Sequence, residues 1–531
     1  MSLEQSKFLS TVEEPVIIDA PEENSYSRLK RLGNMDNEQV RKSVYDVKSA
    51  EKPKQKSFLP IICVIIFSIV YLCPIMTKTP TAHSCLAILI TAAFCWGTEL
   101  VPSYATAYLI PAACVWLRVG YDAESGTRIK ASVLATRLAN KFMDPIIFVF
   151  LGSLTISAAL TKLEITDRVS QFLLSHISPK PRVVLLALMI LNFCIAAFLS
   201  NVASTTLVLT FSLPIIRSLD PDDKFINAIL FGLAWSGNAG GMPTTISSPQ
   251  NILAIKYIND KSATPISFIQ WMGFAAPTSF ILLIVDWIYL IILYKPKSDK
   301  LDTSSGQIEF KPWSFNHTMA VITTIVTIVM WALNETFSYA LGHVGITSLI
   351  PVMVFFSIGI LDSHDFGSLR WSTLVLMGGG LALGEAMTVS GLLDIIADTI
   401  SNGLSGISIW VVLIIIMLIE AILTSVINHT SAAAILFPVL QVIGDSLHHP
   451  TVLLTMSAMM ISCAQLFHIS SFPNALISGV QRHMRMDPSK LTSESFLNGK
   501  DFFLVGWPTV IAGILILASV GYGIVLAMKF E

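Results

Sequence analysis

The sequence predicts an all-α, polytopic membrane protein with about 11 spans, arranged as two inverted repeats that each contain a re-entrant hairpin and a broken transmembrane helix. Three observations lead to this prediction. Only 13% of the 531 residues are charged and 53% are hydrophobic, whereas about 25% of residues are charged in a typical soluble protein. Apolar stretches near bilayer length recur between residues 57 and 529. The polar landmarks of the first half return in the same order in the second half.

The apolar runs give the predicted elements in chain order. The runs interpreted as single spans are 58–75, 84–101, 104–117, 144–160, 267–294, 315–334, 343–361, 372–390 and 502–528. Hairpins are expected at 183–217 and 408–445, and interrupted helices at 225–258 and 451–480. The two hairpins and the two interrupted helices are the features expected to carry function, because a broken helix leaves backbone groups without hydrogen-bond partners.

Residues 1–56 are polar and are predicted to form a disordered cytosolic tail without a secretory signal peptide. Basic residues gather at 41–56, just before the first span, which favours a cytosolic N-terminus. Other basic clusters also fall on the cytosolic side if the hairpins are re-entrant. The segment 118–141 is the exception: it carries five basic residues, yet this topology places it outside, where part of it is expected to form an interfacial helix.

Four landmarks repeat at a separation of 223 to 231 residues. The matching pairs are Phe150-Leu151-Gly152 with Leu376-Met377-Gly378, Asn201–Ser204 with Asn428–Ser431, Ser247–Asn251 with Ser470–Asn474, and Phe274–Pro277 with Leu504–Pro508. If each half crosses the bilayer five times, the two copies insert with opposite orientations. Inverted repeats with paired broken helices are typical of secondary transporters that bind their substrate near the membrane midplane.

Asn201 and Asn428 occupy the predicted hairpin tips, where the backbone reverses. A reversal at membrane depth is tolerated only if it is buried in protein or faces a water-filled cavity. An asparagine suits such a position because it tolerates turn geometry and offers both a carbonyl oxygen and an amide donor. Hydroxyl side chains surround both positions.

The segment 236–251 contains three glycines and two prolines, so it cannot form one regular helix. Free carbonyls at one side of such a break suit Na⁺ or another hard cation, and free N–H groups at the other side suit an anion. Neither hairpin tip nor either break contains a lysine or an arginine. An oxyanion would therefore be held by helix dipoles, hydroxyls and amides. The alternative interpretation is that these asparagines and serines only cap turns and join neighbouring helices.

At these residues the sequence resembles the divalent anion:sodium symporter family of the ion transporter superfamily, over residues 57–529. The tips read Ser200-Asn201-Val202 and Ile427-Asn428-His429 where the family has Ser-Asn-Thr. Both tip threonines and one serine are thus replaced, which argues against a long dicarboxylate as the substrate. The chain looks most like the fungal-type low-affinity phosphate transporters, and 56 residues before the first span are too few for the SPX domain that those often carry.

The resemblance implies an elevator mechanism in a homodimer, with a scaffold of residues 57–180 and 312–402 and a moving transport part of residues 181–294 and 407–529. It implies two Na⁺ sites, formed by Asn201, Ser204, Gly240 and Asn251, and by Asn428, Ser431, Ser470 and Asn474. The anion would contact Ser200, Asn201, Ser248, Asn428, His429 and Ser471. For His429 the alternative is a simple hydrogen bond to a backbone carbonyl.

We expect a secondary transporter of inorganic phosphate with Na⁺ as the coupling ion, no cofactor and no other metal. Sulfate and di- or tricarboxylates follow phosphate as expected substrates. Coupling to H⁺ through Asp286, Glu385, Glu420 or His468 stays open, and so does an uncoupled anion channel. Asp144 lies near a predicted span end, where an interfacial role is expected.

Other function classes find little support. No catalytic constellation of serine, histidine or paired acids is present, so the chain is not expected to be an enzyme. No basic patch indicates nucleic-acid binding. The seven cysteines lack CxxC or Cys/His spacing and are expected to be reduced, packed thiols. The plasma membrane and an organelle membrane such as that of the vacuole are both compatible with the sequence.

Overall fold

The computed structural model describes residues 59–528 except for 123–124, 221, 262–264, 302–309, 311, 335, 405 and 483–493. The predicted tail at 1–56 therefore lies outside the described residues. Two short antiparallel strand pairs accompany the helices: β1 (Tyr121–Asp122) with β2 (Thr127–Arg128), and β3 (Gln481–Arg482) with β4 (Glu494–Ser495). The protein is otherwise helical, as the sequence predicts.

The first half contains the helices α3 (Leu59–Leu72), α4 (Pro80–Thr98), α5 (Ser103–Trp116), α6 (Ala131–Phe142), α7 (Ile146–Lys162), α8 (Ile165–Ser175), α9 (Pro181–Phe198), α10 (Asn201–Ser218), α11 (Phe225–Gly240), α12 (Pro249–Lys261) and α13 (Phe268–Leu293). The second half contains α14 (Phe315–Leu333), α15 (Ser338–Leu341), α16 (Val344–Thr347), α17 (Ile350–Ser357), α18 (Ser363–Ser368), α19 (Trp371–Val389), α20 (Leu392–Leu404), α21 (Ile409–Val426), α22 (His429–Ser446), α23 (Pro450–Cys463), α24 (Phe472–Ser478), α25 (Gly499–Ile516), the π-helix η1 (Leu517–Gly521) and α26 (Tyr522–Ala527).

Eight helices among the described residues are long and apolar enough to cross a bilayer. Most predicted runs coincide with observed helices, but the predicted span at 343–361 does not form one helix. It divides into α16 and α17, and the apolar helical stretch there, Val344–Ser357, is short. Pro351 lies in the first turn of α17 and separates it from α16, because proline is tolerated only at the start of a helix. Gly359, with a φ of +72°, follows the end of α17.

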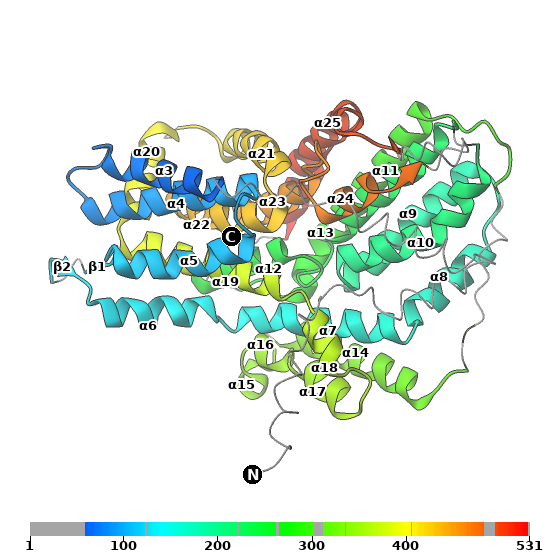
Figure 1. Cartoon of the computed structure of the whole chain (residues 1–531), viewed down its shortest axis with the longest axis horizontal. Helices are drawn as coiled ribbons and strands as arrows, with labels where there is room; N and C mark the ends of the chain where they lie inside the picture. Colours follow the sequence, from blue (N-terminus) through cyan, green and yellow to red (C-terminus); the bar gives the residue numbers. More distant parts are fainter. Residues whose placement is uncertain are drawn as a thin grey trace, which may run out of the picture.

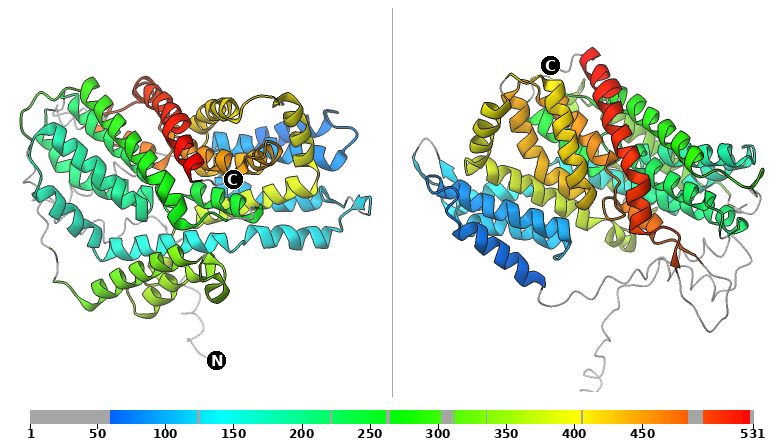
Figure 2. Two further views of the ribbon diagram at one scale, coloured as in Figure 1. Left: turned by 180° about the vertical axis from the view of Figure 1, so that it is seen from behind. Right: turned by 90° about the horizontal axis from the view of Figure 1, so that it is seen from above.

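The repeat is visible in the lengths of the helices. α9, α10, α21 and α22 are each 18 residues long, and they form two helix pairs with tight connections. The broken helices are α11–α12 and α23–α24. Figure 1 shows the α9–α10 pair and the α21–α22 pair on opposite sides of α12 and α23, and the views in Figure 2 agree. α6 and α7 run nearly in line, and α14–α18 lie below α7 in the view of Figure 1.

The first repeated landmark has a packing role. Gly152 on α7 faces the backbone carbonyl of Ser348, and Gly378 on α19 faces that of Phe142, so close that a Cβ at either glycine would collide with it. The two glycines thus let equivalent helices of the two halves approach another backbone closely. Large apolar side chains remain exposed on outer faces, for example Leu72 on α3 and Ile422 on α21, which suits contact with lipid.

Candidate substrate and cation site

The first hairpin tip lies between α9 and α10. Ser200 caps α10, since its hydroxyl accepts a hydrogen bond from the Val202 N–H at 3.3 Å. The carbonyl oxygen of Asn201 accepts hydrogen bonds from the hydroxyls of Ser204 at 3.1 Å and Thr205 at 2.8 Å. The amide side chain of Asn201 takes no part in the cap, so it is left for contacts across the tip.

The first helix break is a buried turn, Gly241–Ser248, between α11 and α12. The Asn251 Nδ2 atom donates to the carbonyl oxygens of Gly241 at 2.9 Å and Thr244 at 2.8 Å. The Ser247 hydroxyl donates to the same two carbonyls, at 2.8 and 2.9 Å. Both carbonyls already accept at least two hydrogen bonds, so the oxygen of this turn that suits a hard cation is one without a donor. The Oδ1 atom of Asn251 is buried and has no hydrogen-bond partner among the described residues.

The first tip and the first break meet at Gly241. A Cβ on this residue would lie 3.4 Å from Asn201 Nδ2 and would also crowd the Ser248 hydroxyl, which donates to the Gly241 carbonyl. The predicted residues Asn201, Ser248 and Asn251 are thus brought together. Gly240, also predicted here, packs against the Phe193 carbonyl of α9, so the absence of a side chain permits close helix contact.

The second helix break, Ala464–Ser471 between α23 and α24, repeats part of the first. Asn474 Nδ2 donates to the Phe467 carbonyl at 3.3 Å and to the Ser470 hydroxyl oxygen at 3.2 Å. The Ser470 hydroxyl donates to the Phe467 carbonyl at 2.9 Å. Each of these three residues lies 223 positions after its counterpart in the first turn. The two turns therefore share one hydrogen-bond pattern.

The second tip is capped differently from the first. Ile427 stands where the first tip has its capping serine and offers no hydroxyl. The cap moves one residue on, and Asn428 Oδ1 accepts the hydrogen bond from the Thr430 N–H at 3.1 Å. The predicted ligand oxygen of Asn428 is therefore already engaged in capping α22.

His429 joins the second tip to the second break at two points. Its backbone N–H donates to the Ser470 carbonyl at 3.1 Å, and its Nε2 lies 3.0 Å from the Ala464 carbonyl. When Nε2 carries the proton it donates to that carbonyl, which is the alternative that the sequence leaves open for this residue. Nδ1 is then the ring atom left for an anion, as an acceptor or, in the imidazolium, as a donor.

Two further predicted residues lie at the second half-site. The Ser471 hydroxyl caps α24 by accepting from the Asn474 N–H at 3.3 Å. The Ser431 hydroxyl is buried and has no hydrogen-bond partner among the described residues. The Ser471 hydroxyl is thus engaged in capping a helix, whereas the Ser431 hydroxyl is left to bind a ligand.

Two amide bridges connect the half-sites, and the sequence did not single them out as ligands. Asn238 Nδ2, near the end of α11, donates to Asn474 Oδ1 at 3.1 Å and to Gln465 Oε1 at 3.2 Å. Gln250 Nε2, on α12, donates to the Ser462 hydroxyl at 2.8 Å. The signal available in the sequence was a polar residue, Asn238, beside the glycines at the end of a largely apolar helix. The two breaks thus form one polar core.

Asn192 on α9 was also missed. Its Nδ2 donates to the Leu233 carbonyl at 2.7 Å, to Ser236 at 3.0 Å and to Thr205 at 3.3 Å. Its Oδ1 and that of Asn238 are buried without a hydrogen-bond partner among the described residues, like Asn251 Oδ1. Buried acceptors usually have a donor or an ion as partner, so three such oxygens around the first break indicate a region suited to cations.

Several charged side chains lie outside this core. Lys256 on α12 pairs with Asp144 at 3.0 Å and with Asp260 at 2.6 Å. Arg137 on α6 pairs with Glu385 on α19. Asp144 and Glu385 are therefore held in ion pairs, whereas the sequence expected an interfacial role for the first and left proton coupling open for the second.

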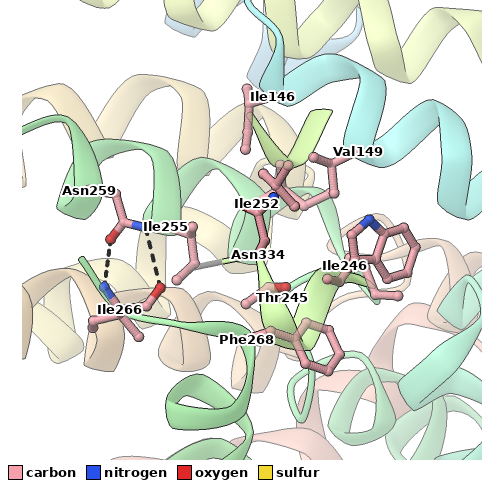
Figure 3. A pocket seen from close by; sticks show the side chains of 12 residues that line it. Ile146, Val149, Thr245, Ile246, Ile252, Ile255, Asn259, Ile266, Phe268 and Asn334 are labelled. Carbon is pink, nitrogen blue, oxygen red and sulfur yellow. Dashed lines mark hydrogen bonds between the residues drawn. The ribbon is translucent and has the colours of Figure 1, made fainter. Parts of the chain in front are cut away.

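A cavity lies beside the polar core. It has a volume of about 50 Å³ and is lined by residues of α7, α12, α14 and the first turn, mostly apolar (Figure 3). Thr245 and Ile246 are the residues it shares with the turn. The nearby Asn259 is occupied with the backbone of Ile266, at 2.9 and 3.3 Å. This apolar cavity does not provide the donors that an anion needs.

The family model described as "Citrate transporter" matches residues 86–461 and 343–528. The chain belongs to this family. It is an integral, multi-pass membrane protein, as the apolar helices and the family together show. The resemblance inferred from the hairpin tips and helix breaks is confirmed.

Curated relatives include both phosphate and dicarboxylate transporters. The chain is 31% identical over 481 residues to the uncharacterized transporter C3B8.04c of Schizosaccharomyces pombe, covering 88% of this chain and 53% of that protein. It is 30% identical over 452 residues to the inorganic phosphate transporter PHO87 of Saccharomyces cerevisiae, and the match covers 84% of this chain and 47% of PHO87. The chain spans about half the length of these two relatives.

A bacterial relative and a solved structure extend the comparison. The sodium-dependent dicarboxylate transporter SdcS of Staphylococcus saprophyticus is 24% identical over 486 residues, covering 84% of this chain and 91% of that protein. MtrF of Neisseria gonorrhoeae, from a class of antimetabolite efflux pumps, aligns with a TM-score of 0.51 at 13% identity, covering 82% and 97% of the two chains. At this identity the second match supports the fold alone.

Proposed function

We propose that this protein is a secondary active transporter that moves inorganic phosphate across a membrane, coupled to Na⁺. The observation that carries the proposal is the duplicated turn. In each half an asparagine amide and a serine hydroxyl donate to the same backbone carbonyl at a helix break, Thr244 or Phe467, and a hairpin tip lies beside it. Such a site offers oxygen ligands for cations, and the N-termini of α10, α12 and α22 offer N–H groups for an anion.

The choice of phosphate rests on the tips. Val202 and Ile427 remove hydroxyls that would hold a second carboxylate. His429 adds an imidazole whose Nε2–H donates to the Ala464 carbonyl, so Nδ1 is the donor to a compact oxyanion when the ring is protonated. PHO87 and the low-affinity phosphate transporter PHO90 of Saccharomyces cerevisiae are relatives with a phosphate activity in their names. Coupling to Na⁺ draws support from the carbonyl turns and from SdcS, a sodium-dependent relative.

Movement would follow an elevator mechanism in a homodimer surrounded by lipid. The moving part would comprise residues 181–294 and 407–529, and the scaffold residues 57–180 and 312–402. The Lys256–Asp144 pair crosses this boundary, with side chains only 12% and 8% exposed. A moving part that slides past the scaffold must break this pair, whereas the Arg137–Glu385 pair lies within the scaffold. Replacing Lys256 with Met would therefore change the rate of movement more than replacing Arg137 with Met.

The decisive test is uptake of labelled phosphate into proteoliposomes that contain the purified chain, with and without an inward Na⁺ gradient. Sulfate, succinate and citrate serve as competitors. Accumulation of phosphate that requires Na⁺ and resists succinate and citrate supports the proposal. Uptake without accumulation against a gradient would indicate an uncoupled channel.

A di- or tricarboxylate symporter is the second candidate, because the matching family is described by citrate and SdcS by dicarboxylate. If the protein is such a symporter, it will accumulate succinate or citrate, and these anions will block the uptake of phosphate. Sulfate uptake in place of phosphate would shift the substrate within the class of tetrahedral divalent anions.

A further inference from the structure

Two buried acids have no hydrogen-bond partner among the described residues. Asp286 on α13 and Glu420 on α21 are 0% and 1% exposed, and both oxygens of each carboxyl group lack a donor. The other intramembrane acids considered above, Asp144 and Glu385, are in ion pairs. The duplicated turns and the hairpin tips make no use of Asp286 or Glu420, so these acids need an explanation of their own.

Glu420 occupies the inner face of the second hairpin. Its neighbours Ile419 and Ile422 on the opposite face of α21 are exposed. On the inner side, Glu420 lies near the Ser457 hydroxyl of α23, a potential donor to its carboxyl group, and this hydroxyl has no other partner among the described residues. The same hairpin meets the end of α23 again where His429 contacts the Ala464 carbonyl. The hairpin and the broken helix therefore contact each other at the acid and at the tip.

An ionised carboxylate at this position would have no counter-ion among the described residues and almost no contact with solvent. The elements packed against α21 carry other titratable side chains, and none of these lies close enough to act on Glu420. Those side chains are His429, Asp445, Cys463, Lys500 and Asp501. Burying a lone charge costs several kcal/mol, so the group is held as a neutral carboxylic acid when the hairpin packs on α23 as it does here.

We propose that Glu420 is a proton-binding site whose loading is coupled to the movement of the second hairpin against α23, so that the protein carries H⁺ together with its anion. The carboxylate takes one proton from the aqueous side that it faces, and the neutral acid then packs against α23. The acid returns to the carboxylate by releasing the same proton on the other side. This inference rests on the proposed transport function and adds a second coupling ion to it.

Asp286 provides a matched comparison. It is as deeply buried and as unpaired as Glu420, but it lies on α13, outside the hairpins. The titratable groups near it are Cys463 and Tyr289. If burial alone made an acid a proton carrier, the two residues would behave alike. If coupling needs the hairpin to move relative to α23, only Glu420 will matter, because Asp286 belongs to the same transport part but not to that hairpin.

The first experiment measures labelled phosphate uptake and luminal pH together, with a pH-sensitive dye trapped in proteoliposomes. External pH stays fixed so that the phosphate species do not change, and only the luminal pH is raised. For the wild type we expect the pH gradient to increase accumulation several-fold and protons to enter with phosphate. Glu420→Gln should lose both responses and still exchange labelled for unlabelled phosphate, while Asp286→Asn should keep both responses.

Proton entry in Glu420→Gln equal to that of the wild type would overturn the proposal, and so would wild-type uptake that ignores the gradient. In either case phosphate uptake itself would leave the proposed function standing. A second measurement needs no variant. Carbodiimide reacts with a protonated buried carboxyl group, so the adduct on Glu420 should fall as pH is raised and as phosphate is cycled. An adduct that is absent at every pH would reject the site, even if phosphate proved not to be the substrate.

Discussion

The two helix breaks share the hydrogen bonds that an asparagine and a serine donate to one carbonyl, Thr244 in the first turn and Phe467 in the second, but they differ elsewhere. The first turn is buried throughout, and Trp271 covers it with a hydrogen bond from Nε1 to the Met242 carbonyl at 3.0 Å. The second turn is more open, with Ile469 44% exposed. At the tips, Asn201 has a free amide, whereas Asn428 caps its own helix and His429 fastens the tip to the break. Duplication thus conserved the turn, and the tips diverged. We infer that the turns serve the function common to both halves and that the second tip sets the choice of anion.

The largest expected effect comes from removing the asparagine that closes a turn. Asn251→Ala leaves the Gly241 and Thr244 carbonyls without their amide donor and removes an oxygen from the proposed cation site. Losing about 3 kcal/mol of site stabilisation corresponds to a drop of at least about 100-fold in Na⁺-dependent uptake. Uptake in proteoliposomes measures this loss.

Asn259→Ala is the matched control, because Asn259 lies on the same helix and bonds only the backbone at Ile266. It should retain most of its uptake. If both variants transport normally, the turn is not part of the cation site. Asn474→Ala should reproduce the Asn251→Ala loss if the two turns are functionally equivalent.

The bridges between the half-sites should give an intermediate effect. Asn238→Leu breaks the contacts with Asn474 and Gln465 while keeping a similar volume, so Asn474 loses the partner that orients it. We expect the apparent Na⁺ affinity to fall about tenfold. Gln250→Leu removes the other bridge. It should lower the apparent Na⁺ affinity less, because the partner of Gln250, Ser462, is not a predicted ligand. Equal, negligible changes would mean that the two halves work independently.

A smaller and more selective effect is expected at the second tip. His429→Thr restores the residue that dicarboxylate-binding relatives have at this position and removes the contact with the Ala464 carbonyl. Phosphate should bind about tenfold more weakly, and succinate should begin to compete. His364→Thr, at an exposed position on α18, is the control. An unchanged substrate profile would place His429 outside the anion site.

The smallest effect is expected from Ile427→Ser. This change gives the second tip the serine that caps the first, so Asn428 can release its capping bond. A helix cap contributes about 1 kcal/mol, which corresponds to a change of about fivefold in anion affinity. Thermal unfolding in detergent and uptake kinetics measure the two consequences separately. A shift in unfolding temperature without any shift in affinity would show that the cap matters for the fold alone.

Much of the fold could be predicted because apolar periodicity and helix breakers act locally. The hairpins, the breaks and most spans fall within a few residues of their predicted positions, since Pro249, Pro473 and the glycines of the first turn interrupt a helix in any context. The division of 343–361 into α16 and α17 was missed. Its apolar composition is that of a membrane span, although it contains two residues that interrupt or end helices, Pro351 and Gly359.

The candidate site was predictable in part. Repetition pointed to Asn251 and Asn474 without any structure, because chance does not return four landmarks in order. Asn238 and Gln465 were missed, since they contact each other across 227 positions of sequence and carry no motif. The pairing of Lys256 with Asp144 was likewise invisible, because only folding brings α12 beside the start of α7.

The sequence by itself determined the membrane class, the duplication and the position of each helix break, because these follow from local composition and from residues that cannot continue a helix. The tertiary structure decided which polar groups remain free. It engaged Asn428 as a cap and His429 as a clamp, linked the two breaks through Asn238, and left Glu420 buried without a partner. These outcomes depend on which atoms face one another after packing, and hydrogen bonds act only over about 3 Å.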